Sequence, residues 1–196
     1  LRESHPGWNF EVVQAEPESS TGMLRSGRID VALTMSTSHM PAAGDPEFHT
    51  EPVMVELFDA ILPYHHPLAP RTDLHLAEDL ADEDWIMSAH GTAWYSCVTA
   101  ATSQAGFQPR VAHTVDDFSA VFALVRAGLG IAVVPRLAWT GLNPPHVVVR
   151  GVRDTARRHV VALTRAGSSA EPLLTAVREA ADKVPVPSVG PFAVAG

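Results

Sequence analysis

The chain has 196 residues, of which 46% are hydrophobic and 18% charged, a balance typical of a folded globular protein of one or two domains. Its formal net charge of -8 argues against an autonomous nucleic-acid-binding module, because such modules carry a basic surface. Its single cysteine, Cys97, excludes an internal disulfide, and no apolar run reaches the roughly 18 residues that a membrane span needs. The sequence starts without a methionine or the apolar core of a signal peptide, so we expect a fragment or a processed chain.

Strand-like and helix-like segments alternate in the first part of the chain. Residues 9–16 and 29–34 are short runs rich in β-branched or apolar residues, and they predict two strands. Between them, Pro17 suits the first turn of a helix over residues 17–26, which Gly27 ends. A strand, a helix and a strand in so short a stretch form a βαβ unit, so we expect the two strands to be parallel neighbours.

The middle of the chain begins with a loop rich in Ser, Pro and Gly over residues 36–46. It continues with a long strand over residues 53–62, a helical turn over 77–80 and a short strand over 85–88. A helix is predicted over residues 93–105, because apolar residues recur there at helical spacing. These apolar residues are Trp94, Cys97, Val98, Ala101 and Ala105. We expect a packing role for the cysteine on this face.

A second βαβ unit is predicted from three consecutive segments. Residues 110–115 form its first strand, and residues 116–127 form its helix, which Asp116 or Asp117 caps. Residues 130–134 (GIAVV) return as an almost wholly apolar strand, which we therefore expect to be central in its sheet. The remaining predicted elements are two strands and a terminal helix, over residues 146–150, 159–164 and 169–183.

Arginines gather near the last two predicted strands. We expect them to form a solvated strand edge, since charged edges prevent pairing with other sheets. They are Arg150, Arg153, Arg157 and Arg158.

The motifs of common enzymes are absent from the sequence. Gly128 and Gly130 follow a helix and precede a strand, the reverse of the order in a dinucleotide-binding loop, so we expect a helix cap and a tight turn. There is no Gly-x-Ser-x-Gly elbow, and the ten histidines are scattered without a metal-binding pair. Lys183 is the only lysine, so any lysine-based chemistry would depend on it. We therefore expect no catalytic residue, no metal and no cofactor.

Hydroxyl and carboxylate side chains gather where predicted strands end and predicted helices begin. Helix N-termini offer free N–H groups that suit anions and carboxylates, although such residues also serve as simple helix caps. Their shared placement favours one ligand-binding cleft. The residues are Ser19, Ser20, Ser36, Thr37, Ser88, His90, Thr92, Thr114 and Asp117.

Several short motifs occur in the order and spacing of one known family. They are SHPG (residues 4–7), GRIDVAL (27–33), HPLA (66–69), DL with WI (79–80 and 85–86), AGFQP (105–109) and LVRAGLGIAVVP (124–135). The last of these is the most specific. Through these motifs the chain resembles the effector-binding domain of LysR-type transcriptional regulators over most of its length.

The resemblance implies an α/β fold of two Rossmann-like lobes, of the type 2 periplasmic-binding-protein architecture, joined by two crossover strands near residues 59–63 and 135–139. The implied parts are lobe I over residues 1–62 and 136–185, lobe II over residues 63–135, and a tail over residues 186–196. Measured against the family, the first strand of lobe I and most of its first helix are missing. Residues 189–194 (VGPFAV) are one candidate to fill that place.

The resemblance also implies where an effector binds. The family's ligand-contacting positions, carried over motif by motif and completed by the threonine beside Ser36, are Glu18, Ser19, Ser36, Thr37, Ser88, Gly91, Thr92, Val115, Asp117, Phe118 and Pro135.

The expected function follows from the same resemblance. A small effector, for which the helix N-termini suit a carboxylate, would bind in the cleft and shift the population of lobe geometries or dimer packings. A helix-turn-helix module absent from this chain would carry that change to DNA. We expect a non-enzymatic, cytoplasmic homodimer or homotetramer without membrane contact. The alternatives are an extracytoplasmic solute-binding protein and a small enzyme of the same fold, since fold does not dictate function.

Overall fold

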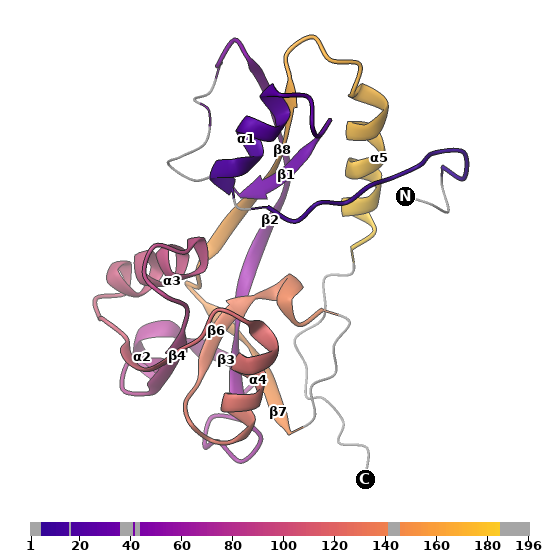
Figure 1. Cartoon of the computed structure of the whole chain (residues 1–196). Helices are drawn as coiled ribbons and strands as arrows, with labels where there is room; N and C mark the ends of the chain where they lie inside the picture. Colours follow the sequence, from indigo (N-terminus) through magenta and orange to yellow (C-terminus); the bar gives the residue numbers. More distant parts are fainter. Residues whose placement is uncertain (1–4, 16, 36–40, 42–43, 141–145, 185–196) are drawn as a thin grey trace. The chain divides into compact units, whose positions relative to one another are not determined.

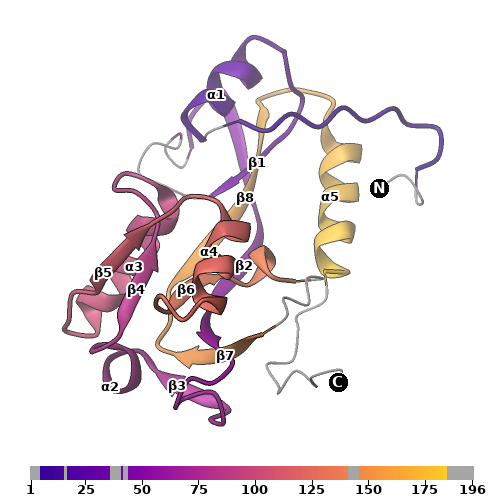
Figure 2. The ribbon, with the colours of Figure 1, turned by 60° about the horizontal axis from the view of Figure 1, so that its bottom comes forward.

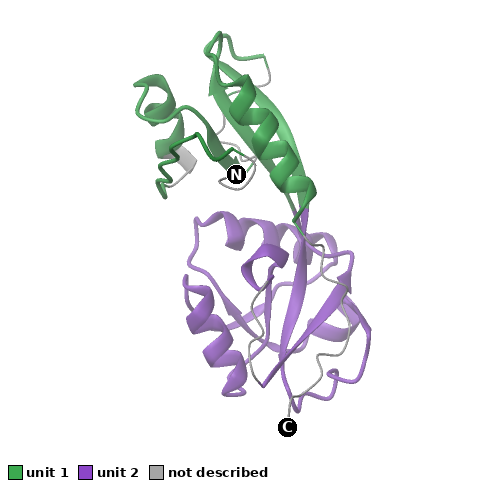
Figure 3. Cartoon of the chain, turned by 90° about the vertical axis from the view of Figure 1, so that its right-hand side faces the viewer, with its two compact units in different colours: residues 1–55, 158–185 green, residues 56–157, 186–196 purple. Residues whose placement is uncertain are grey.

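The computed structural model describes residues 5–15, 17–35, 41, 44–140 and 146–184, apart from the side chains of Pro17 and Glu18 (Figure 1). The described chain forms two compact units, one of residues up to 55 together with 158–184, the other of residues 56–157 (Figure 3). Within the described residues, no helix is long and apolar enough to cross a membrane. The tail over residues 186–196, with its candidate segment 189–194, lies outside the described residues.

The first unit consists of strands flanked by two helices (Figure 1). β1 (Ala32–Met35) pairs antiparallel with β8 (Arg157–Arg165), which in turn lies next to β2 (Phe48–Pro63). Helix α1 (Pro17–Arg25) buries Leu24 in a small core with residues of all three strands, and α5 (Glu171–Asp182) buries its own apolar face. The predicted helices over residues 17–26 and 169–183 are therefore confirmed with slightly shorter bounds.

The strand predicted over residues 9–16 is wrong. Residues 9–15 belong to no strand, and the side chain of Val12 is 93% exposed. A strand is stable only beside a hydrogen-bonded neighbour, and these residues have none among the described part of the chain. The parallel pair expected with residues 29–34 is consequently also wrong, since β1 lies antiparallel to β8.

The three segments predicted as the second βαβ unit form a strand, a helix and a strand, but another strand, residues 84–87, lies between the two strands in the sheet. β4 (Asp84–Met87) and β5 (Arg110–Thr114) are parallel neighbours, with α3 (Ala93–Gln104) between them in the chain (Figure 2). Helix α4 (Phe118–Arg126) follows β5 and leads into β6 (Ala132–Pro135). The smaller elements of this unit are β3 (Asp73–His75), α2 (Leu76–Leu80), the 3-10 turn Arg136–Ala138 and β7 (Val147–Arg153).

Strand β6 is central, as its apolar sequence predicts. It pairs antiparallel with β2 on one side and is linked in parallel to β4 through the bridge between Trp85 and Ile131. All four of its residues are buried. The half-buried Cys97 packs against the same core, in the packing role expected for it.

The unit boundaries fall at other residues than the predicted lobe boundaries. The resemblance implies that residues 136–157 belong to lobe I, whereas the structure groups them with the second unit. The physical cause is β7, which pairs with the second half of β2 on one side and with β3 on the other. The lobe bounds 1–62 with 136–185 and 63–135 stay a prediction about the family architecture.

The solvated edge expected for the late arginines is wrong for Arg150. β7 lies between two strands, and Arg150 is only 6% exposed, whereas Arg153 and Arg157 are exposed. Its Nε donates to the carbonyl of Ala69 at 3.0 Å and its Nη1 to the carbonyl of Val149 at 2.7 Å. Burial lowers the pKa of the Arg150 guanidinium, and these carbonyls replace the water that it loses.

Candidate functional site

The carboxyl ends of β4, β5 and β6 meet at one edge of the second unit. Met87 pairs with Thr114 in parallel register, and the N–H of Val115 donates to the carbonyl of Met87 at 2.8 Å. β6 runs parallel to β4, so Pro135 ends its strand at the same edge. In open α/β sheets, ligands bind beyond the carboxyl ends of the strands.

The turn between β4 and α3 is held by two hydroxyls. Thr92 Oγ1 donates to the carbonyl of Ala89 at 3.0 Å and accepts from the N–H of Tyr95 at 3.1 Å, which caps α3. Ser88 Oγ lies 2.6 Å from Thr92 Oγ1, and since the Thr92 proton is already used, Ser88 is the donor. Both hydroxyl protons are thus committed inside the turn, and the serine is buried.

Backbone donors are left over at this turn. Gly91 adopts a φ of 90°, a left-handed conformation that favours glycine, and it lies directly before the cap. Among the described residues, the N–H groups of Ala93 and Trp94 have no acceptor. The first turn of α3 therefore offers free N–H groups, where a helix also carries partial positive charge.

The turn between β5 and α4 carries two adjacent carboxylates with different roles. Asp116 Oδ1 accepts from the N–H of Ala89 at 2.9 Å, and this bond ties the two turns together. Asp117 caps α4 by accepting from the N–H of Ala120 at 2.9 Å and from the hydroxyl of Ser119. The Ser119 hydroxyl, and after it the Ala120 N–H, lowers the pKa of Asp117, whose exposed carboxylate is therefore ionised at neutral pH.

Trp94 joins the two helices to β6. Its Nε1 donates to the carbonyl of Val133 at 2.8 Å, and its ring lies 5.0 Å from that of Phe118, measured between centroids. Trp94 is buried in the core, so it is a packing residue rather than a stacking platform for a ligand. His90 and Tyr95 are less buried, with their rings 4.2 Å apart beside the β4–α3 turn.

The structure brings together the predicted site residues of the second unit. At the carboxyl edge of β4, β5 and β6 lie Ser88, Gly91, Thr92, Val115, Asp117, Phe118 and Pro135. The others belong to the first unit. Ser19 is exposed on α1, the side chain of Glu18 is outside the described part, and so are Ser36 and Thr37.

Sequence reasoning missed a buried carboxylate network behind this edge. Asp59 on β2 is fully buried and accepts from Arg136 Nε at 2.7 Å, from Arg136 Nη2 at 2.6 Å and from Trp139 Nε1 at 3.0 Å. Glu56, also buried, accepts from the N–H of Leu137 at 2.6 Å. These bonds fasten the turn after Pro135 to β2. The available signal was two acidic residues inside an otherwise apolar strand, residues 53–62.

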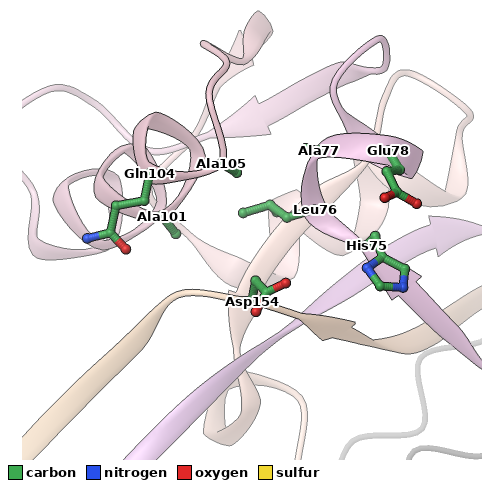
Figure 4. A pocket seen from close by; sticks show the side chains of 8 residues that line it. All are labelled: His75, Leu76, Ala77, Glu78, Ala101, Gln104, Ala105 and Asp154. Carbon is green, nitrogen blue, oxygen red and sulfur yellow. The ribbon is translucent and has the colours of Figure 1, made fainter.

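Two hollows of the second unit lie away from these turns. One, of about 250 Å³, is lined by apolar residues that include Leu76 and Ala101 and by the carboxylates of Glu78 and Asp154 (Figure 4). The other, of about 390 Å³, lies at the end of β2 beside Tyr64. Within the described residues, no three His, Cys, Asp or Glu side chains are grouped so that they could hold a metal ion.

Comparison with protein families gives one match over nearly the whole chain. A model described as the LysR substrate binding domain matches residues 1–184. Among curated proteins, the regulator ShiR of Corynebacterium glutamicum is 31% identical over 147 residues, which are 73% of this chain and 47% of ShiR. The dual regulator GltC of Bacillus subtilis is 28% identical over 150 residues, 76% of this chain and 48% of GltC. The chain thus spans about half the length of these relatives.

Solved structures show the same fold. A mutant of OxyR from Corynebacterium glutamicum superposes with a TM-score of 0.78 at 23% identity, covering 93% of this chain and 56% of that one. The regulatory domain of CcmR from Synechocystis, solved in complex with 2-PG, has a TM-score of 0.74 at 15% identity, covering 94% of this chain and 88% of that one. These structures confirm the predicted α/β fold class of the periplasmic-binding-protein type.

Proposed function

Since this chain belongs to the family of LysR substrate binding domains, we propose that it is the effector-sensing part of a transcriptional regulator. The observation that carries the proposal is the carboxyl edge of β4, β5 and β6, where free backbone donors and a capped carboxylate lie on two turns tied by the Asp116–Ala89 bond. A small molecule bound there would be read out by a DNA-binding module outside this chain.

The chemistry of the edge selects the effector. The free N–H groups at the first turn of α3 suit an anionic or strongly accepting group, such as a carboxylate. The ionised Asp117 repels a carboxylate and instead accepts hydrogen bonds, so the opposite end of the ligand must donate. We therefore propose a small hydroxy- or amino-carboxylate, which presents an acceptor to one turn and a donor to the other.

The hydroxyls of Ser88 and Thr92 act in this proposal as positioning groups. Both hydroxyls donate their protons to acceptors inside the turn, so neither donates to the effector. They instead hold the backbone whose N–H groups bind the acceptor group of the effector. Val115 and Phe118, both half-buried, supply apolar surface at the same edge, and the buried Pro135 lies behind them. On the first unit, Glu18, Ser19, Ser36 and Thr37 stay the proposed contacts.

The response is a shift in population. An effector that binds one arrangement of the two turns more tightly than another favours that arrangement by its difference in affinity. No covalent step is involved, and we propose that the domain is not an enzyme, in keeping with relatives that are transcriptional regulators. We further propose a cytoplasmic homodimer or homotetramer. The same relatives favour this function over that of an extracytoplasmic solute-binding protein.

A thermal-shift panel of small hydroxy-, amino- and unsubstituted carboxylates tests the proposal. A ligand at about 100 times its Kd stabilises the domain by about 2.7 kcal/mol, which raises Tm measurably. Thr92→Trp, placed at the α3 cap, should abolish the shift, whereas Ala100→Trp on the exposed face of the same helix should keep it. A shift that survives Thr92→Trp would show that the effector binds elsewhere, and a panel without any shift would count against the proposed effector class.

A further inference from the structure

The hollow at the end of β2 lies at the opposite end of β6 from the effector edge. In the antiparallel pair of β2 and β6, Ala132 lies opposite Ile61 and Pro135 opposite Phe58. Residues just beyond Pro63 are therefore at the amino end of β6, while the effector edge is at its carboxyl end. The volume of about 390 Å³ is within the usual range for small-molecule pockets.

Backbone bonds hold the walls of this hollow together. The N–H of Tyr64 donates to the carbonyl of His146 at 3.2 Å, which joins the end of β2 to the start of β7. His146 adopts a left-handed φ of 63° there. The rings of Tyr64 and His65 meet edge to face with centroids 5.0 Å apart. Both imidazoles and the phenol are thus carried by one hydrogen-bonded junction.

The third wall is the C-terminal end of α4. The N–H of Gly128 donates to the carbonyl of Val125 at 2.9 Å, and the N–H of Leu129 donates to the carbonyl of Leu124 at 3.1 Å. These two bonds satisfy carbonyls that would otherwise present partial negative charge to a ligand. Arg126, in the last turn, adds a full positive charge to this wall.

The charge of the lining is the reverse of the charge of the chain. The chain has 22 acidic and 14 basic residues, yet the described residues that line the hollow include Arg126, His65, His146 and Tyr64 and no Asp or Glu. An arginine fork with imidazole donors matches the oxygens of phosphate and sulfate. We propose that this hollow is a second binding site, for a doubly charged oxyanion: free phosphate or the phosphate group of a small metabolite.

Titration with sulfate and phosphate tests the site. Backbone amide shifts are followed by NMR while chloride is exchanged to keep the ionic strength constant. We expect saturable shifts at residues 64–65, 126–128 and 146, with a Kd of about 1–10 mM, as befits an exposed site with a single arginine. Arg126→Gln should weaken binding roughly tenfold. Arg153→Gln, at the other end of β7, should leave it unchanged.

A second variant, His146→Asn, distinguishes loss of binding from loss of the local fold. His146→Asn removes the imidazole but keeps a residue that tolerates left-handed φ, so the junction with Tyr64 is preserved. It should weaken binding several-fold.

The outcomes separate the sources of the anion. Tighter binding of glycerol phosphate than of inorganic phosphate assigns the site to a metabolite, whereas equal binding assigns it to the free oxyanion. The absence of saturable shifts, or equal affinity in the wild type, Arg126→Gln and His146→Asn, overturns the proposal. None of these results depends on the effector edge, because the titrated amides lie at the other end of β6.

Discussion

The buried carboxylate of Asp59 offers the sharpest test of the energetics. Its side chain has no exposed surface, and it accepts two bonds from the Arg136 guanidinium and one from the Trp139 indole. Asp59 strongly favours the charged form of Arg136 and raises its pKa. Asp59→Ala removes the anion and leaves the cation and the indole N–H without this partner.

The size of the effect follows from the burial of the two partners. Breaking a buried ion pair by removing one partner costs about 3–5 kcal/mol, because the other charge stays desolvated. The Arg136 side chain keeps 15% of its surface exposed, so water partly solvates the released guanidinium. We therefore expect Asp59→Ala to lower the free energy of unfolding by about 3 kcal/mol, near the lower end of this range. The total stability of a protein is about 5–15 kcal/mol.

Urea denaturation followed by circular dichroism measures this loss as a change in midpoint at constant slope. The control is Asp84→Ala, since Asp84 pairs with Arg110 at the surface, where the two side chains are 53% and 65% exposed. Such pairs contribute less than about 1 kcal/mol. A loss below about 1 kcal/mol in Asp59→Ala, or additive losses when Arg136→Ala is combined with it, would refute the reasoning.

Five further variants, at four positions, test local features. The stability difference between the wild type and Asp117→Asn should shrink as pH falls through the lowered pKa of Asp117, because the ionised cap stabilises only above it; denaturation at several pH values measures this. Gly130→Ala should lower the free energy of unfolding by about 1–3 kcal/mol, because a Cβ there would lie 2.7 Å from the carbonyl oxygen of Asp84. Gly22→Ala should instead raise it by up to about 1 kcal/mol, because a Cβ at this position of α1 would have no atom within 4 Å and alanine favours a helix. Thr92→Ala removes the cap of α3 and should lower the free energy of unfolding by about 1 kcal/mol. Thr92→Ser keeps the hydroxyl and should lower it much less, so equal losses in the two variants would contradict the capping bond.

Helices were predictable from the sequence because their determinants are local. The caps Thr92 and Asp117 lie at the starts of α3 and α4, and Gly106 and Gly128 follow their ends with positive φ. Helical hydrogen bonds join residues four apart, so periodicity and end signals within one segment suffice. The polar turns of the candidate site were visible for the same reason, since each directly follows a strand and precedes a cap.

Strand partners were not predictable in this way. Residues 9–15 have the composition of a strand but no described neighbour, and β1 pairs with β8, more than 120 residues away. The expected parallel pairing failed because a β-ladder depends on which distant segment is available, and composition does not encode that.

The sequence by itself indicated the family, the α/β alternation and the positions of the helices, and seven of the residues proposed from it for the site lie together at the carboxyl edge of the second unit. Only the tertiary structure decided the bonds that organise that edge: Asp116 to Ala89 and Asp59 to Arg136, 27 and 77 residues apart. It also decided that Arg150 is buried rather than solvated. The reason is physical: such interactions depend on desolvation and on the meeting of remote segments, which no local pattern records.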